Sequence, residues 1–223
     1  MMNNTVYTIG HSTHTIEEFV RILKTNEINC ICDVRSSPFS KFVPQFNRDV
    51  LKENLKKNKI EYLEFGKEFG ARRTNPGLIE NGIVSFEKVA KDETFISGVN
   101  RMLNGLNKGY KMALMCSEKD PVECHRNVLV SRNLAKLGIE IIHILSDGTI
   151  QTNAELEEAM ISKYIKPADR KEINERKQYP RTLLDDNIEP QISNIVESKI
   201  SLIELAYERA NERIGYRKDE EEE

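Results

Sequence analysis

The sequence predicts an α/β fold: a mostly parallel sheet of about five strands with helices on both faces, followed by a helical C-terminal extension. Over the first 150 residues, short β-branched, aromatic or apolar runs alternate with segments of helical periodicity. Strands that alternate with helices in this way form βαβ units, and the strands of such units run parallel. The five expected strands span 5–9, 29–34, 60–65, 110–116 and 139–145.

Capping signals place the helices between these strands. Thr15 and Glu18 form a capping box, in which each side chain can bond the backbone N–H of the other. Asp120 as N-cap, followed by Pro121 and Glu123, predicts a helix that begins at Pro121 and is closed by a glycine. The expected helices span 16–24, 48–58, 85–106 and 121–137, and the Gly-rich, basic segment 66–82 is expected to be a loop.

The composition changes after residue 150, so we divide the chain into an α/β domain (1–150), a helical extension (151–216) and an acidic, disordered tail (217–223). Within the extension, residues 191–217 have apolar positions at helical spacing, which predicts a long amphipathic helix. Packing on its own domain is favoured over a dimer seam, because no sustained heptad with flanking charges is present. The polar segment 166–190 has no clean period and resembles a linker.

Charge and hydropathy restrict the cellular setting. The chain has 223 residues and a formal net charge of −3, which gives no global attraction to nucleic acid or anionic membranes. No apolar run approaches a membrane span, and the N-terminus lacks a charged-then-apolar signal. We therefore expect a cytoplasmic protein without a membrane partner, in which the four cysteines are reduced.

Chemically active side chains follow four of the predicted strands. In chain order they are His11 and Ser12, then Arg35, then Arg72 and Arg73, and then Cys116 and Glu118. The carboxyl ends of parallel strands share one rim, where α/β proteins bind their ligands. Because these residue types carry out acid–base, nucleophilic or anion-binding chemistry, the sequence predicts a functional site at this rim.

We predict three catalytic residues, each with an alternative. Glu118 is expected to act as acid or base, and Cys116 as a nucleophile or as a thiol that shapes the site, unless it is an inert buried thiol. His11 would assist proton transfer, or it is only a turn histidine. The predicted substrate-binding residues are Ser12, Arg35, Arg72, Arg73, His125 and Arg126.

Other polar and sulfur side chains have structural interpretations. Arg35 could equally pair with Asp33, because the two lie two apart on one strand face. Cys30 and Cys32 are expected in the core for the same reason, and His143 is expected within the last buried strand.

No cofactor and no metal ligand are predicted. A zinc site from Cys116, Cys124 and His125 or His11 stays open as an alternative, although C-x7-C-H is not a usual zinc spacing. A redox disulfide between Cys116 and Cys124 is a further alternative. For Cys124 alone, core packing is favoured.

Several motifs occur in the order found in a known family. They are Tyr-Thr-Ile-Gly-His-Ser (7–12), Asp-Val-Arg (33–35), Pro-Gln-Phe-Asn (44–47), Phe-Gly-Ala-Arg-Arg (69–73) and Cys-x-Glu-x-x-Pro-x-x-Cys-His-Arg (116–126). On these residues the chain resembles the bacterial and archaeal domain-of-unknown-function family 488 over about residues 5–148. The resemblance names a family but no reaction, and residues 149–223 lie outside it.

A weaker similarity is to rhodanese-like and cysteine-phosphatase-like α/β domains. Those enzymes use a strand-end cysteine as nucleophile, with loop N–H groups that hold an oxyanion. The phosphatase pattern places an arginine six residues after the cysteine, whereas here Val122 stands there and Arg126 follows four residues later. Glu118 in this loop would also repel a dianion, so a covalent phospho- or persulfide mechanism is disfavoured.

Three function classes follow from the sequence. The favoured one is an enzyme, of hydrolase or transferase class, that acts on a small anionic or nucleotide-like substrate at the rim. The second is a nucleic-acid or nucleotide-binding module, whose basic loop contacts phosphates while the Phe-rich loop 39–46 stacks bases. The third is a structural protein that forms a homodimer through its C-terminal helix.

Overall fold

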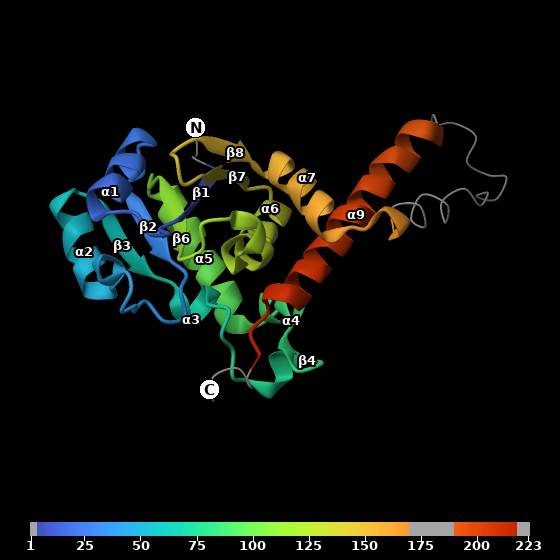
Figure 1. Cartoon of the computed structure of the whole chain (residues 1–223), viewed down its shortest axis with the longest axis horizontal. Helices are drawn as coiled ribbons and strands as arrows, with labels where there is room; N and C mark the ends of the chain where they lie inside the picture. Colours follow the sequence, from blue (N-terminus) through green and yellow to red (C-terminus); the bar gives the residue numbers. More distant parts are fainter. Residues whose placement is uncertain (1–3, 170–189, 218–223) are drawn as a thin grey trace.

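A six-stranded sheet with the strand order β3-β2-β6-β1-β7-β8 forms the centre of the molecule (Figure 1). The structure is a computed structural model that describes residues 4–169 and 190–217. Five strands run parallel, which confirms the predicted α/β class. They are β1 (Thr5–Gly10), β2 (Cys30–Asp33), β3 (Glu61–Glu64), β6 (Met112–Cys116) and β7 (Glu140–Ile144). A sixth strand that was not predicted, β8 (Ile150–Thr152), pairs antiparallel with β7.

Helices cover both faces of this sheet, as predicted. One face carries α1 (Ile16–Thr25) and α2 (Arg48–Lys57). The other carries α3 (Gly66–Phe69), α4 (Phe86–Ala90), α5 (Glu93–Asn107) and α6 (Arg132–Lys136). Side chains alternate along each strand, so Ile31 packs with α1 and α2 while Cys30 and Cys32 are fully buried on the opposite face. Thr15 accepts from the Glu18 N–H at 3.2 Å, which confirms it as the N-cap of α1.

The segment expected as one loop, 66–82, contains more structure than predicted. It includes α3 and the strand β4 (Ile79–Glu80), which forms a hairpin with β5 (Ile83–Val84). The helix expected over 85–106 is divided into α4 and α5, because the Asp92 side chain accepts from the Thr94 N–H at 3.0 Å and starts a second helix.

The helix predicted over 121–137 begins later and is irregular, so this prediction was wrong at its N-terminal end. Asp120 does cap a turn, since it accepts from the Val122 N–H at 2.9 Å, but this turn is a short 3₁₀ helix, η3 (Pro121–Glu123). Cys124 is then extended, with φ −132° and ψ 136°. A π-helical segment, η4 (Arg126–Ser131), follows and leads into α6. Ser131 stabilises this wide turn, because its hydroxyl donates to the Arg126 carbonyl at 2.9 Å.

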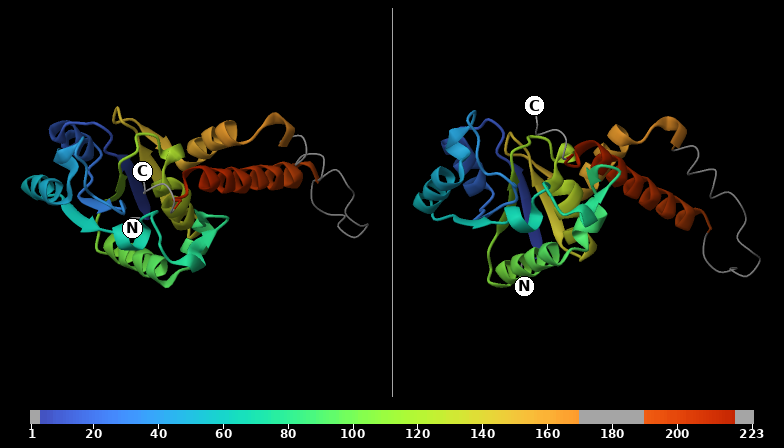
Figure 2. Two further views of the ribbon diagram at one scale, coloured as in Figure 1. Left: turned by 60° about the horizontal axis from the view of Figure 1, so that its bottom comes forward. Right: turned by 90° about the horizontal axis from the view of Figure 1, so that it is seen from below.

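The C-terminal extension packs on its own domain, as the sequence favoured. The helix α9 (Pro190–Ile214) runs alongside α7 (Asn153–Tyr164) in all views (Figure 1, Figure 2). Tyr207 of α9 is 2% exposed, and its hydroxyl donates to Glu157 of α7 at 3.2 Å. None of the described helices is long and apolar enough to cross a membrane.

Residues 215–217 continue from α9 onto the β4–β5 hairpin. The Val84 N–H donates to the Tyr216 carbonyl at 3.0 Å, and Ile83 forms an antiparallel bridge with Arg217. This contact joins the end of the described chain to the hairpin. Most of the predicted linker and of the acidic tail lies outside the described residues.

Candidate functional site

The carboxyl ends of three strands meet at one rim, because β6 lies between β1 and β2. The register pairs Gly10 of β1 with Cys116 of β6. Pairing continues past the strand end, where the His11 N–H donates to the Cys116 carbonyl at 2.9 Å. A Cβ at Gly10 would lie 1.9 Å from the Glu118 carbonyl oxygen, so only glycine allows the loop after β6 to approach this closely.

A pocket of about 310 Å³ opens at this rim and brings together five of the predicted site residues. They are Arg35, Arg72, Cys116, Glu118 and His125. One wall of the pocket comes from the C-terminal segment, namely Arg213–Arg217. No local pattern predicted this wall, because a contact between residues so far apart in the chain has no signature in nearby residues.

Four side chains of the types that can bind a metal ion cluster beside the pocket. Donor atoms of Cys116, Glu118, Cys124 and His125 all lie within 4.8 Å of one another. The Cys116 thiol donates to Glu118 Oε2 at 2.6 Å, and the Cys124 thiol donates to the same oxygen at 3.1 Å. The extended conformation of Cys124 turns its sulfur toward Cys116, so Cys124 is both buried in the core and part of the site.

The imidazole of His125 is fixed from behind by the end of β2. Its Nε2 lies 3.0 Å from the Val34 carbonyl oxygen, which can only accept a hydrogen bond, so Nε2 carries a proton. Nδ1 therefore faces the cluster, 3.6 Å from the sulfur of Cys116. The sequence left the direction of His125 undecided, because a regular helix from Pro121 would not aim it.

Arg126 holds the loop that carries Glu118 instead of lining the pocket. It is fully buried, and its guanidinium donates to the Glu118 carbonyl at 2.7 Å and to the Lys119 carbonyl at 3.3 Å. Its backbone N–H lies 3.4 Å from the sulfur of Cys124. Arg126 thus orders two members of the cluster from beneath.

Burial and mutual contact change the ionisation of the cluster. Burial, together with the neighbouring Cys124 sulfur, raises the pKa of the Cys116 thiol. Burial opposes ionisation of Cys124, but its contacts with Cys116 and Arg126 lower its pKa overall. Withdrawal from water raises the pKa of Glu118, whose carboxylate turns inward although the residue as a whole is exposed. Cys116 therefore keeps its proton more readily than an ordinary thiol.

Arg35 forms an ion pair with Asp33, which was the structural alternative that the sequence left open. Its guanidinium donates to Asp33 Oδ2 at 2.6 Å, and both side chains are at most 5% exposed. The Tyr62 hydroxyl donates to the same carboxylate oxygen at 2.7 Å. Arg35 is also among the residues that line the pocket. Asp33 therefore fixes Arg35 at the rim.

The remaining predicted residues lie outside the pocket lining. His11 is buried, stacks on Phe46 at 4.2 Å between ring centroids and has Nε2 3.1 Å from Arg35 Nη1. Burial lowers the pKa of His11 to about 4. Ser12 bonds the loop after β6 through its backbone N–H, and Arg73 donates to the carbonyls of Lys67 and Glu68. These three residues support the rim without facing the pocket.

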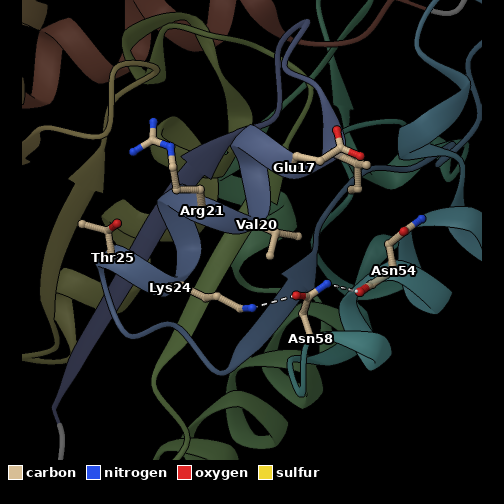
Figure 3. A pocket seen from close by; sticks show the side chains of 8 residues that line it. Glu17, Val20, Arg21, Lys24, Thr25, Asn54 and Asn58 are labelled. Carbon is tan, nitrogen blue, oxygen red and sulfur yellow. Dashed lines mark hydrogen bonds between the residues drawn. The ribbon is translucent and has the colours of Figure 1, made fainter.

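A second hollow of about 430 Å³ lies between α1 and α2 (Figure 3). Its polar side chains have partners within the protein. Lys24 Nζ donates to Asn58 Oδ1 at 2.7 Å, and Asn58 Nδ2 donates to the backbone carbonyl of Asn54 at 2.8 Å. None of the predicted site residues lines it. The strand-end pocket is therefore the better candidate for the functional site.

The model of the family described as Domain of unknown function DUF488 matches residues 15–133, which is more than half of the chain. The chain belongs to the DUF488 family. The match includes Arg35, Arg72, Cys116, Glu118 and His125, but the pocket wall from the C-terminal segment lies outside it. No curated protein and no solved structure matches the chain, so the weaker similarity to rhodanese-like domains stays a prediction.

Proposed function

We propose that this DUF488 protein is an enzyme that acts on a small anionic or nucleotide-like substrate in the strand-end pocket. One observation carries the proposal: reactive side chains and arginines from four separate segments line the same hollow of about 310 Å³. A pocket with a few convergent polar groups is the usual form of a small-molecule site.

The reactive end of the pocket consists of Cys116, Glu118 and His125. A carboxyl group such as that of Glu118 is a common acid or base in hydrolysis and group transfer. Cys116 is 2% exposed and its thiol donates a hydrogen bond to Glu118, which favours a thiol that shapes the site over a free nucleophile. We therefore place the reaction in the hydrolase or transferase class.

The arginines of the pocket supply the positive charge that would bind the anionic group of the substrate. Guanidinium groups outnumber carboxylates among the lining residues, which include Arg35, Arg72, Arg213 and Arg217 against Glu118 and Glu123. Arg213 pairs with Glu123 at 3.4 Å, and the Arg72 guanidinium lies 5.7 Å from the centre of the Tyr216 ring. Planar guanidinium groups suit phosphate and carboxylate, since they can donate two parallel hydrogen bonds.

A thermal-shift screen with phosphate, sulfate, small carboxylates and mononucleotides tests this proposal. A ligand that binds the native state raises the melting temperature by mass action. Arg72→Ala and Arg217→Ala should weaken the response to a hit several-fold, whereas the matched surface variant Arg21→Ala, outside this pocket, should not. Ligands whose thermal shift is unchanged in Arg72→Ala, Arg217→Ala and Glu118→Gln would bind elsewhere, and this result would refute the proposal.

Exposed phenylalanines favour nucleic-acid binding as a second candidate function. Phe39 is 66% exposed and Phe42 is 96% exposed, and Lys41 lies between them. Exposed aromatic rings beside a cation are suited to stacking of unpaired bases. Single-stranded oligonucleotide binding that weakens with salt and is lost in Phe42→Ala would support this function. Absence of binding at low salt would remove it.

A further inference from the structure

The cluster of Cys116, Glu118, Cys124 and His125 contains the donor atoms that zinc prefers. Thiolate sulfur, imidazole nitrogen and carboxylate oxygen are the usual protein ligands of Zn²⁺, and four of them complete a tetrahedral site. The two thiols and the imidazole favour zinc over magnesium or calcium, which take oxygen ligands. The four donor atoms come from ten consecutive residues, Cys116–His125.

We propose that these four side chains bind one Zn²⁺ ion at the base of the strand-end pocket. All four donor atoms lie within 4.8 Å of one another. Donors bound to one tetrahedral zinc lie about 3.3–3.8 Å apart, as follows from bond lengths of about 2.0–2.3 Å. The site therefore requires only small side-chain shifts to accept the ion.

The hydrogen bonds of the cluster show how the ion would replace protons. Both sulfurs lie within hydrogen-bonding distance of Oε2 of Glu118, so any thiol protons of the metal-free cluster lie among the four donor atoms. Binding of Zn²⁺ replaces the thiol protons that are present by Zn–S bonds and releases these protons to solvent. The oxidation states of metal and sulfur stay unchanged, and no co-reactant is needed.

Groups around the cluster are arranged as the outer shell of a metal site. Metal-binding histidines donate their second ring N–H to a carbonyl or carboxylate, which orients the ring. His125 has this contact, from Nε2 to the Val34 carbonyl at 3.0 Å, and it turns Nδ1 toward the cluster. The Arg126 N–H points at the Cys124 sulfur from 3.4 Å, which stabilises a thiolate. This arrangement is a second observation, independent of the clustering of the donors.

The position of the cluster indicates that the ion would be reachable from the pocket. Cys116, Glu118 and His125 line the pocket, whereas Cys124 lies behind them. Glu118 is the exposed member of the set, so it is the ligand that an incoming molecule could displace. A site with three firm ligands and one exchangeable position is the form that zinc takes in enzymes.

Metal analysis of the full chain tests the proposal. The chain is purified under reducing conditions without chelator, and the expected content is about one zinc per chain. Cys124→Ala and His125→Ala should each lower the zinc affinity at least tenfold. Cys32→Ala is the matched control, because it removes an equally buried thiol that lies outside the cluster. Circular dichroism establishes that each variant is folded.

Titration of the chelator-treated, reduced chain with Co²⁺ gives a second, spectroscopic measurement of the site. Co²⁺ in the proposed site gives the absorption band of a cobalt–thiolate bond, and Zn²⁺ abolishes it by competition. A chain that binds neither ion, or a band that disappears in Cys32→Ala but persists in Cys124→Ala, would overturn the proposal. Metal content is measured without substrate, so this test and the ligand screen fail separately.

Discussion

His125 donates its Nε2 proton to the carbonyl oxygen of Val34, 3.0 Å away, and this bond joins the loop after β6 to the end of β2. The two residues belong to different βαβ units, so the sheet itself decides where the imidazole points. The same bond turns Nδ1 toward Cys116. The orientation of the His125 imidazole thus depends on a backbone carbonyl, which a motif of side chains cannot predict.

Removal of Asp33 should strongly destabilise the fold. In Asp33→Ala the guanidinium of Arg35 stays buried without its partner, and the Tyr62 hydroxyl loses its acceptor. A buried pair that loses one member costs about 3–5 kcal/mol. Urea unfolding measures the change. The control Asp49→Ala breaks an exposed pair with Arg48 and should change the free energy of unfolding by less than about 0.5 kcal/mol. Equal effects of the two variants would contradict the role of the buried pair.

Gly10→Ala should destabilise the rim by about 1–3 kcal/mol, the usual cost of overpacking. The added Cβ would lie 1.9 Å from the Glu118 carbonyl oxygen, so the loop that carries Glu118 has to move. Gly77→Ala serves as control, because its Cβ would meet only the Asn75 side chain, at 3.3 Å. Denaturant midpoints of the two variants give the comparison. A neutral Gly10→Ala would show that the loop moves freely.

His143 should make the protein less stable as the pH falls. It is fully buried, with Nδ1 2.8 Å from the Thr8 hydroxyl and Nε2 3.3 Å from Asn153 Oδ1. Burial lowers the pKa of His143 from 6.5 to about 4. The unfolded chain therefore binds the proton first, and stability is lost as the pH falls below 6.5 toward 4.

The expected contribution of His143 is a loss of about 2 kcal/mol between pH 7.5 and pH 5. Unfolding free energies of the native chain and of His143→Gln, measured at both pH values, isolate this part from the other titrating groups. The variant should lose less stability on acidification than the native chain. Parallel pH profiles would mean that His143 accepts its proton without penalty inside the fold.

Tyr207→Ala should detach α9 from α7 and weaken the pocket wall at the same time. Truncation of a buried aromatic side chain costs about 3–5 kcal/mol, and Tyr207 is 2% exposed. Tyr207→Phe keeps the ring and loses only the bond to Glu157, so it should cost about 1 kcal/mol. Thermal melts report the stability. The rise in melting temperature that a ligand causes should be smaller in Tyr207→Ala and unchanged in Tyr207→Phe. An unchanged rise in both variants would show that α9 does not contribute to ligand binding.

Local patterns were sufficient for much of the fold and for part of the site. The capping residue Thr15, the alternation of strands and helices, and the placement of Cys116 and Glu118 at the end of a strand all follow from nearby residues. The helix start near Asp120 was misjudged. The Asp120 capping bond forms as expected, but the backbone is then extended at Cys124. The π-helical segment η4 follows, which the Ser131 hydroxyl stabilises.

The sequence by itself determined the α/β class, the family and the strand-end location of the candidate site, because hydrophobic periodicity, capping and glycine requirements act over a few residues. Only the tertiary structure decided which donors meet. Cys124 and His125 join Cys116 because an irregular turn and the Val34 carbonyl aim them. The residues Arg213–Arg217 complete the pocket because α9 packs back on the domain, and such long-range packing has no local signature.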